Sequence, residues 1–298
     1  MQVPSHVEYE RATSVEHALS LLSRPDTRVL AGGHSLIPMM KLRLAQPEVL
    51  VDINDLAELS YIRLDGGQLR IGALARHADL LDSALAGEQF PIFHDAERVV
   101  ADPIVRLWGT VGGSLCQADP SEDLSAVFAA TRAVAVIRGR DGDRAVPVRE
   151  FHLGPYQTVI GPGELLAEVR VPVPVPAHGG VGSAYEKVAR RVGDWSVAGV
   201  GAVLRLGKNH VEDAGIGLTA VGAEHFVAAE AEDFLRGQAP DDENFRAAGA
   251  IAAEHCHPVA DQRGPEDYKR HLVAELTARA LRRAAERATE RAAARAGR

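Results

Sequence analysis

The stretch Val29-Leu30-Ala31-Gly32-Gly33-His34-Ser35-Leu36 decides how this sequence is interpreted. An apolar run typical of a strand ends in two glycines, and a serine then precedes an apolar segment from Leu36 to Leu44. This order predicts a strand, a tight turn and the start of a helix. Glycine permits positive φ and leaves the backbone open to a ligand. Unpaired N–H groups at a helix start attract anions, so this turn is a candidate phosphate site.

A second stretch, Gly109-Thr110-Val111-Gly112-Gly113-Ser114-Leu115, has the same pattern. It is followed by Asp119-Pro120-Ser121-Glu122-Asp123 and by an apolar helical run from Leu124 to Thr131. Either turn alone has an ordinary structural explanation, because the chain contains 28 glycines in 298 residues, slightly above typical usage. Two such turns, each at the head of a helical pattern, are what a diphosphate held between two loops requires.

Composition and charge exclude several classes of protein. The net charge of −8 argues against a nucleic-acid surface. The sequence has no apolar run of roughly 18 residues, so no membrane span is expected. Its N-terminus lacks the apolar core of a signal peptide, which favours a cytoplasmic location. We expect no nucleic-acid partner.

The cysteine content limits the metal chemistry of the chain. Only Cys116 and Cys256 are present, whereas an iron–sulfur cluster usually takes four thiolates. Cys256 lies between His255 and His257, but the usual zinc spacings are absent. A buried or incidental role is favoured for these residues, and no metal site is expected in this chain.

Local patterns predict the elements. Ser14 is a candidate N-cap for a helix with an apolar stripe from Val15 to Leu22. The first turn lacks the Gly-x-Gly-x-x-Gly fingerprint, so a Rossmann fold is not supported. Asp-Gly sequences at 65–67 and 141–143 predict hairpins. Strands are expected at 28–31, 50–53, 61–64, 68–71, 133–137, 183–188, 197–206 and 211–221, and helices at 36–44, 77–84, 94–107, 124–131, 241–255 and 265–290.

The two turns resemble the two flavin-diphosphate loops of the FAD-binding medium subunits of molybdenum hydroxylases, also called the xanthine dehydrogenase family. The resemblance covers nearly the whole chain, and within the family it is closest to medium subunits of aerobic carbon monoxide dehydrogenases. Xanthine-, aldehyde- and nicotine-type hydroxylases remain open as alternatives. Four further matching segments follow in chain order: Pro162-Gly163-Glu164-Leu165-Leu166, Ala184-Tyr185-Glu186-Lys187, Arg191-Val192-Gly193-Asp194-Trp195 and Gly264-Pro265-Glu266-Asp267-Tyr268.

The resemblance implies an α+β chain with the PCMH-type FAD-binding fold. A small β-α-β unit and a unit with a mixed or antiparallel sheet would precede a C-terminal unit of antiparallel strands and helices. The expected ranges are 1–56 and 57–176 for the two FAD-binding subdomains and 177–298 for the C-terminal medium-subunit domain. Alternating prolines at 171–180 favour an extended linker that cannot join a central sheet. The Arg/Ala-rich end after Glu286 is expected to fray in solvent or, less favoured, to touch a partner.

The resemblance also implies the residues that contact FAD. In the first turn the backbone N–H groups and one hydroxyl would hold the diphosphate, and the second turn would do the same from the other side. Because FAD carries the redox chemistry, no catalytic residue is assigned. The implied contacts are Ala31, Gly32, Gly33, His34, Ser35 and Leu36 in the first turn, Thr110, Val111, Gly112, Gly113 and Ser114 in the second, and Asp123, Leu166, Lys187 and Trp195 elsewhere.

Five of these residues have competing interpretations. Asp123 is either the N-cap of the following helix or a contact of the adenosine, and both can hold. Lys187 is either a solvated strand residue or a cation near the flavin ring. Leu166 is either plain core or an apolar neighbour of the flavin. Trp195 either stacks on the flavin or is buried between the second and third units. His34 could bond covalently to flavin, as in some larger oxidases, but the third unit here is small for that role.

The implied function is electron transfer. A large partner subunit would hold the molybdenum cofactor and oxidise the substrate, and a small partner would hold two [2Fe–2S] clusters. Electrons from the clusters would reach FAD in this chain and leave to an external acceptor such as a quinone. The assembly expected is a dimer of heterotrimers. The alternatives are a stand-alone FAD-dependent reductase or oxidase of the same fold, and a scaffold that has lost its flavin.

Overall fold

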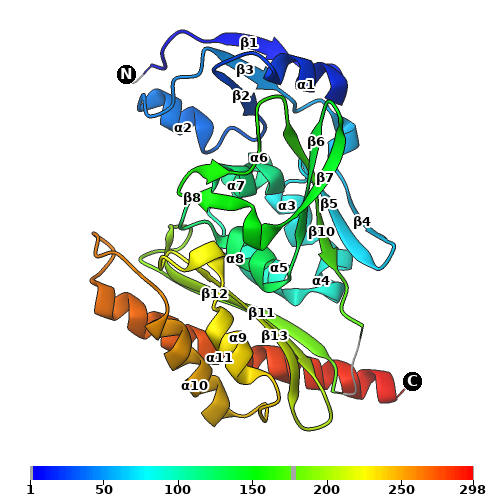
Figure 1. Ribbon diagram of the computed structural model, residues 1–298, viewed down its shortest axis with the longest axis vertical. Helices are drawn as coiled ribbons and strands as arrows, with labels where there is room; N and C mark the ends of the chain where they lie inside the picture. Colours follow the sequence, from blue (N-terminus) through cyan, green and yellow to red (C-terminus); the bar gives the residue numbers. More distant parts are fainter. Residues whose placement is uncertain (1–2, 176–178, 298) are drawn as a thin grey trace.

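The computed structural model describes residues 3–175 and 179–297 and arranges them in three successive tiers along its longest axis (Figure 1). The N-terminal tier lies at one end, the middle tier contains the largest sheet, and the C-terminal tier lies at the other end. Each tier has its own sheet and its own helices. The expected α+β class is therefore confirmed.

The first tier is a small parallel sheet in the order β1-β3-β2. Ser14 caps α1 as predicted, because its hydroxyl accepts a hydrogen bond of 3.1 Å from a backbone N–H of the first turn. The sequence pattern missed β1, which reads Glu-Tyr-Glu-Arg and lies at a sheet edge without an apolar face. The elements are β1 (Glu8–Arg11), α1 (Val15–Leu22), β2 (Thr27–Leu30), α2 (Leu36–Lys41), β3 (Val49–Asp52) and the 3₁₀ turn η1 (Ala57–Leu59).

The second tier is built on an antiparallel sheet in the order β4-β5-β10-β6-β7. Pro172 ends the central strand, β10, so the expectation that the proline-rich segment stays out of this sheet is wrong at its first two residues. At Pro172 only β5 lies alongside, because the pairing with β6 ends at Arg170. The strands are β4 (Ile62–Asp65), β5 (Gln68–Gly72), β6 (Val134–Gly139), β7 (Gly142–Pro147) and β10 (Leu165–Pro172), beside a small sheet of β8 (His152–Gly154) and β9 (Gln157–Thr158).

Short helices pack on this sheet. The single helix expected at 94–107 is wrong, because the chain breaks between α5 and α6. Ala101 has φ of 45°, and Asp102 then caps a new helix whose first residue is Pro103. The helices are α3 (His77–Asp82), α4 (Ala84–Gln89), α5 (Pro91–Glu97), α6 (Pro103–Trp108), α7 (Val111–Gln117), α8 (Asp123–Ala130) and the 3₁₀ turn η2 (Val148–Glu150).

The third tier is an antiparallel sheet between two layers of helices (Figure 1). Helix α11 packs on β11 and β12 with α10 against it, and α8 of the second tier packs on β12 and β13 from the other face. Gly217 makes this approach possible, because a Cβ there would lie 1.9 Å from the carbonyl oxygen of Ala126. The elements are β11 (Val181–Ala189), β12 (Ser196–Leu206), β13 (Val211–Thr219), η3 (Glu224–Phe226), α9 (Ala229–Leu235), α10 (Asp242–Glu254) and α11 (Glu266–Ala296).

Helix α11 continues past the point at which the sequence predicted fraying. Ala288 is fully buried, and Arg287 forms an ion pair of 2.6 Å with Asp95 of α5. Arg291 donates to the carbonyl oxygen of Gln89 at 3.1 Å. These contacts are one helical turn apart and fasten the helix to the second tier, so the prediction of a frayed end is wrong as far as Arg291, and the helix continues to Ala296.

Buried apolar clusters mark the three tiers, but two of the clusters include residues from a neighbouring tier. The cluster of the first tier includes Leu74 and Leu165 from the second tier. Tyr185 of the third tier lies in the cluster of the second. The domain ranges 1–56, 57–176 and 177–298 remain a proposal. The boundary after residue 176, and the part of the expected linker at 176–178, lie outside the described residues.

Candidate functional site

The first glycine turn joins the end of β2 to the start of α2. Gly33 has φ of 73°, the left-handed region that glycine enters freely, as the sequence predicted. Within the described part of the chain, no group accepts a hydrogen bond from the backbone N–H groups of residues 32–36. Five successive amides are therefore available to an anion.

Polar side chains hold this turn from behind. Asn54 donates through Nδ2 to the carbonyl oxygen of Ala31 at 2.8 Å and to the carboxylate of Asp52 at 2.7 Å. Arg76 donates to Oδ1 of Asn54 at 2.8 Å and also reaches the carbonyl oxygen of Trp108. Sequence reasoning missed Asn54 and Arg76, and no motif marks them, because each acts through residues distant in the chain.

The second glycine turn differs in its hydrogen bonding. The backbone N–H groups of Val111 and Gly112 donate at 2.9 Å to carbonyl oxygens just after β5. Those of Gly113 and Ser114 donate at 3.0 Å to the side chain and the carbonyl oxygen of Thr110. The fold already uses these four amides, and their contact with FAD stays a prediction. The donors that remain in this turn of the described chain are the side-chain hydroxyls of Thr110 and Ser114 and the backbone N–H of Thr110.

The two turns touch each other across the boundary between the first and second tiers. A Cβ on Gly32 would lie 2.2 Å from the carbonyl oxygen of Trp108 and 2.8 Å from Cα of Gly109. Gly112 is packed as closely on the second side, where a Cβ would lie 2.6 Å from Cβ of Ala73. The structure therefore brings together the two segments that the sequence placed about one site.

A buried pair lies behind the second turn. Nδ1 of His77 is 3.0 Å from both carboxylate oxygens of Glu97, and Nε2 is 3.0 Å from Oγ of Ser114. His77 and Glu97 are 3% and 0% exposed. Burial alone would lower the pKa of His77, but the charge and hydrogen bond of Glu97 raise it above its usual value. Burial raises the pKa of Glu97. Sequence reasoning missed both residues, because only the fold brings them together.

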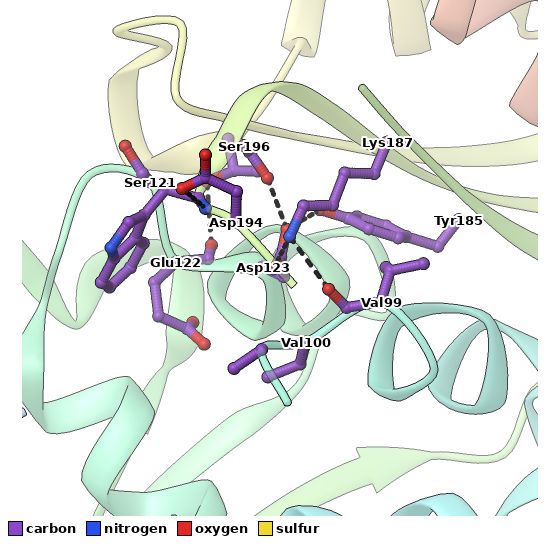
Figure 2. Close-up of polar contacts among 12 residues, drawn as sticks. Val99, Val100, Ser121, Glu122, Asp123, Tyr185, Lys187, Asp194 and Ser196 are labelled. Atoms are coloured by element: carbon purple, nitrogen blue, oxygen red, sulfur yellow. Dashed lines mark hydrogen bonds and ion pairs between the residues drawn. The ribbon is translucent and has the colours of Figure 1, made fainter. Parts of the chain in front are cut away.

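Asp123 is the centre of a second buried network, shown in Figure 2. Its Oδ1 accepts from the hydroxyls of Tyr185 at 2.5 Å and Ser196 at 2.7 Å, and its Oδ2 accepts from Nζ of Lys187 at 2.7 Å. Lys187 also donates to the carbonyl oxygen of Val99 at 3.2 Å. Burial and the negative charge of Asp123 hold the pKa of Tyr185 well above its usual value, so its hydroxyl remains a donor.

This network corrects two interpretations. Lys187 is not a solvated strand residue, because only 4% of its side chain is exposed. Asp123 is the first residue of α8, and the N-cap is Glu122, whose carboxylate accepts from the backbone N–H of Ser125 at 2.8 Å. The ion pair joins the second tier to the third. Contact of either residue with FAD stays a prediction.

The other implied contacts lie in different environments. Leu166 on β10 is buried in the core of the second tier. Trp195 is 44% exposed, so the alternative that it is buried between two units is wrong. Its loop packs on the connection before α6, where a Cβ on Gly193 would lie 3.0 Å from the carbonyl oxygen of Ala101. His34 is exposed, with Nδ1 2.8 Å from the carbonyl oxygen of Gly32.

The two cysteines and the acidic and histidine side chains form no metal centre in the described chain. Over residues 3–175 and 179–297, no group of His, Cys, Asp and Glu side chains could hold a metal ion. Cys256 is buried in the core of the third tier, as expected, and its thiol donates to a backbone carbonyl at 3.3 Å. None of the helices described here has the length and apolar character needed to cross a membrane.

Two family models match the chain. Residues 5–174 match the FAD binding domain in molybdopterin dehydrogenase, and residues 183–284 match the CO dehydrogenase flavoprotein C-terminal domain. The chain therefore belongs to the family of FAD-binding flavoproteins of the molybdopterin dehydrogenases. The resemblance described from the sequence is confirmed, and FAD is the cofactor of this family.

Individual relatives place the chain near carbon monoxide dehydrogenases. It is 40% identical to the carbon monoxide dehydrogenase medium chain of Hydrogenophaga pseudoflava, over 94% of this chain and 97% of that one. It is 36% identical to the glyceraldehyde dehydrogenase medium chain of Sulfolobus acidocaldarius, over 93% and 98%. A structure of carbon monoxide dehydrogenase from Hydrogenophaga pseudoflava that lacks the Mo-pyranopterin moiety of the molybdenum cofactor matches with a TM-score of 0.92 and 40% identity, covering 96% and 99% of the two chains. The likeness therefore spans all three tiers.

Proposed function

We propose that this chain is the FAD-carrying electron-transfer subunit of a carbon monoxide dehydrogenase. The contact between the two glycine turns carries the proposal. A Cβ on Gly32 would lie 2.8 Å from Cα of Gly109 in the second turn, so both turns form one surface. The five available amides at residues 32–36 suit a diphosphate, which needs several donors and no cationic side chain. The residues present therefore fit the cofactor of the family.

Each turn contributes differently to the proposed site. The amides of Gly32, Gly33, His34, Ser35 and Leu36, with the Ser35 hydroxyl, would bind the diphosphate from the first tier. From the second tier the donors would be the hydroxyls of Thr110 and Ser114 and the backbone N–H of Thr110, because the amides of Val111 to Ser114 are already used. The second-tier side of the site would be formed by the closely packed Val111, Gly112 and Gly113. Ala31 would form the first-tier side.

The remaining proposed contacts lie farther along the chain. The exposed Trp195 is available to stack on an aromatic ring. Lys187 would bring a cation toward the flavin, but Asp123 compensates its charge at 2.7 Å, so the pair would act through hydrogen bonds and position. Leu166 would act through packing alone. When bound, FAD supplies a two-electron store between one-electron donors and an external acceptor.

Partner subunits complete the proposal. The relatives are named medium chains, and this name supports an assembly with a larger and a smaller subunit. This chain has two cysteines, too few for the usual iron–sulfur ligation. We therefore propose a large partner with the molybdenum cofactor, a small partner with [2Fe–2S] clusters, and a dimer of these heterotrimers. A quinone acceptor and a cytoplasmic location stay predictions of the sequence.

Carbon monoxide is the proposed substrate of the complex because of the relative at 40% identity. The glyceraldehyde dehydrogenase chain follows at 36%, so an aldehyde is the second candidate. This chain would not contact either substrate. Its sequence therefore informs on the substrate only through its relatedness to these proteins.

The test is purification of the chain together with the products of neighbouring genes. We expect a flavin absorption spectrum, one FAD per chain, and reduction of an artificial electron acceptor when carbon monoxide is added. Reduction by aldehydes alone would assign the second substrate. Turnover by the isolated chain would favour the stand-alone reductase. A complex without flavin would contradict the proposal.

A further inference from the structure

Ser114 of the second turn is connected to the buried interior by a continuous chain of polar atoms. Its Oγ lies 3.0 Å from Nε2 of His77, whose Nδ1 lies 3.0 Å from both carboxylate oxygens of Glu97. Ser114 is half-buried, whereas the two residues behind it are almost fully buried. Gly109 leaves room for the imidazole, because a Cβ there would lie 2.8 Å from Cδ2 of His77. The proposed function gives Ser114 a role but leaves the other two residues unexplained.

The direction of the hydrogen bond between Ser114 and His77 depends on one proton. A serine hydroxyl has a single hydrogen to donate. If the His77–Glu97 pair holds an extra proton, Nε2 carries a hydrogen and donates to Oγ, so the serine hydrogen points elsewhere. This holds whether the proton sits on the imidazole or on the carboxylate. If the pair loses that proton, Nδ1–H still donates to Glu97, and Nε2 must accept the serine hydrogen.

We propose that His77 and Glu97 are positioning residues that orient the Ser114 hydroxyl toward the cofactor diphosphate by holding one proton. In the protonated state Ser114 donates its hydrogen to a phosphate oxygen. In the deprotonated state the Ser114 oxygen presents only lone pairs to the diphosphate dianion and therefore repels it. FAD affinity is therefore coupled to the protonation of a residue that does not touch FAD. This inference rests on the proposed function.

The charges that surround His77 favour the protonated state. Burial lowers the pKa of His77, but the negative charges of Glu97 on α5 and of Glu122 and Asp123 at the start of α8 outweigh it and raise this pKa above its usual value. Lys187 offsets part of the charge of Asp123. Arg106 on α6 acts on Glu97 in the opposite sense. The net effect keeps the proton on the pair at and above the usual pKa of a histidine, about 6.5.

The experiment measures FAD affinity as a function of pH. The complex, or the full chain if it holds flavin alone, is stripped of FAD and titrated with it by flavin fluorescence from about pH 6 to about pH 9. The wild type is compared with Ser114→Ala. We expect Ser114→Ala to bind about tenfold more weakly at the acidic end, a loss equivalent to about 1.4 kcal/mol. At the basic end the two proteins should bind alike.

Two further variants make the comparison specific. Ser35→Ala removes a hydroxyl of the first turn. This hydroxyl has no titrating partner in the described chain, so the loss of FAD affinity should be the same at every pH. Ser114→Thr restores a hydroxyl and should restore the pH dependence. Any pH dependence left in Ser114→Ala reports other groups. His77→Gln, where it folds, keeps a donor to Ser114 and should bind well across the range.

The outcomes separate this inference from the proposed function. If the wild type binds no FAD at any pH, the proposed function fails. If it binds FAD but the ratio of wild-type to Ser114→Ala affinity is constant with pH, the proposed function stands and the inference is overturned. The inference is also overturned if Ser35→Ala and Ser114→Ala give the same pH profile.

Discussion

The two glycine turns look alike in sequence and differ in the structure. In the first turn, Gly32 to Leu36, the amide N–H groups have no partner in the described chain, and the supporting side chains are the neutral Asn54 and the half-buried Arg76. In the second turn the amides of Val111 to Ser114 are already bound, and the buried pair His77–Glu97 lies behind it. The same two-glycine pattern therefore provides backbone donors in one place and a closely packed wall in the other.

This contrast has an energetic meaning. A turn with free amides is suited to a ligand. Each unpaired N–H costs the free energy of one hydrogen bond unless water or an anion accepts from it. A turn with bound amides contributes to folding, and only its side chains are left for binding. Substitutions behind the second turn should therefore affect stability first, and substitutions at the first turn should affect FAD binding first.

The largest effect on stability is expected at Lys187, whose ion pair with Asp123 joins the second tier to the third. Replacement by Met leaves the carboxylate of Asp123, 7% exposed, without its cation. Removing one partner of a buried pair costs about 3–5 kcal/mol, to be measured by urea unfolding. The double variant Asp123→Asn/Lys187→Met should cost less. The exposed pair Arg138–Asp143 is the matched control, where Arg138→Met should cost under about 1 kcal/mol. Equal costs for the two pairs would remove the contrast.

The next effect is expected where the turns meet, at Gly32. A Cβ there lies 2.2 Å from the carbonyl oxygen of Trp108 and 2.8 Å from Cα of Gly109, so Gly32→Ala must push the two tiers apart. Overpacking of this kind costs about 1–3 kcal/mol, and FAD affinity should fall by more than about tenfold. Gly87 on α4 is the control, because a Cβ there meets nothing within 4 Å. If Gly32→Ala retains normal FAD affinity, the turns do not share one ligand.

A third effect is the pH dependence of stability that His77 and Glu97 confer. The pKa of His77 is raised in the folded chain, so the folded state binds the proton more tightly than the unfolded state. The stabilisation is complete below about pH 6.5 and is lost as pH rises through the folded pKa, with a slope of at most about 1.4 kcal/mol per pH unit. Urea unfolding at several pH values should show this decline, and His77→Gln should flatten it. Stability that rises over this range would contradict the assignment.

The smallest effect is expected behind the first turn, at Asn54. Asn54→Ala removes the hydrogen bonds to the carbonyl oxygen of Ala31 and from Arg76. The expected cost is about 1 kcal/mol, because these groups are only partly buried and water can replace the lost partner. Asn244→Ala, which removes an exposed hydrogen bond of 3.1 Å on α10, should change stability by less than about 0.5 kcal/mol. A cost at Asn54 as large as that at Lys187 would contradict this order of effects on stability.

Sequence patterns were most reliable where a local rule acts alone. The cap at Ser14, the hairpin at Gly66 and Gly67, and the strand before the first turn follow from neighbouring residues. The prediction of one unbroken helix at 94–107 was wrong, because Asp102 caps a new helix that begins at Pro103. The apolar pattern concealed this signal. The prediction that the end of α11 frays was wrong, because this end contacts α4 and α5, which lie far away in the chain.

The sequence by itself determined the two glycine turns, the family and its cofactor, since these depend on short motifs that keep their order along the chain. Only the tertiary structure decided which amides are free, which charges are buried, and that Asp123 and Lys187 are one ion pair. The physical reason is that a hydrogen bond or a desolvated charge depends on what lies within a few ångströms. At this site those neighbours come from segments many residues apart, such as His77 and Glu97 behind Ser114.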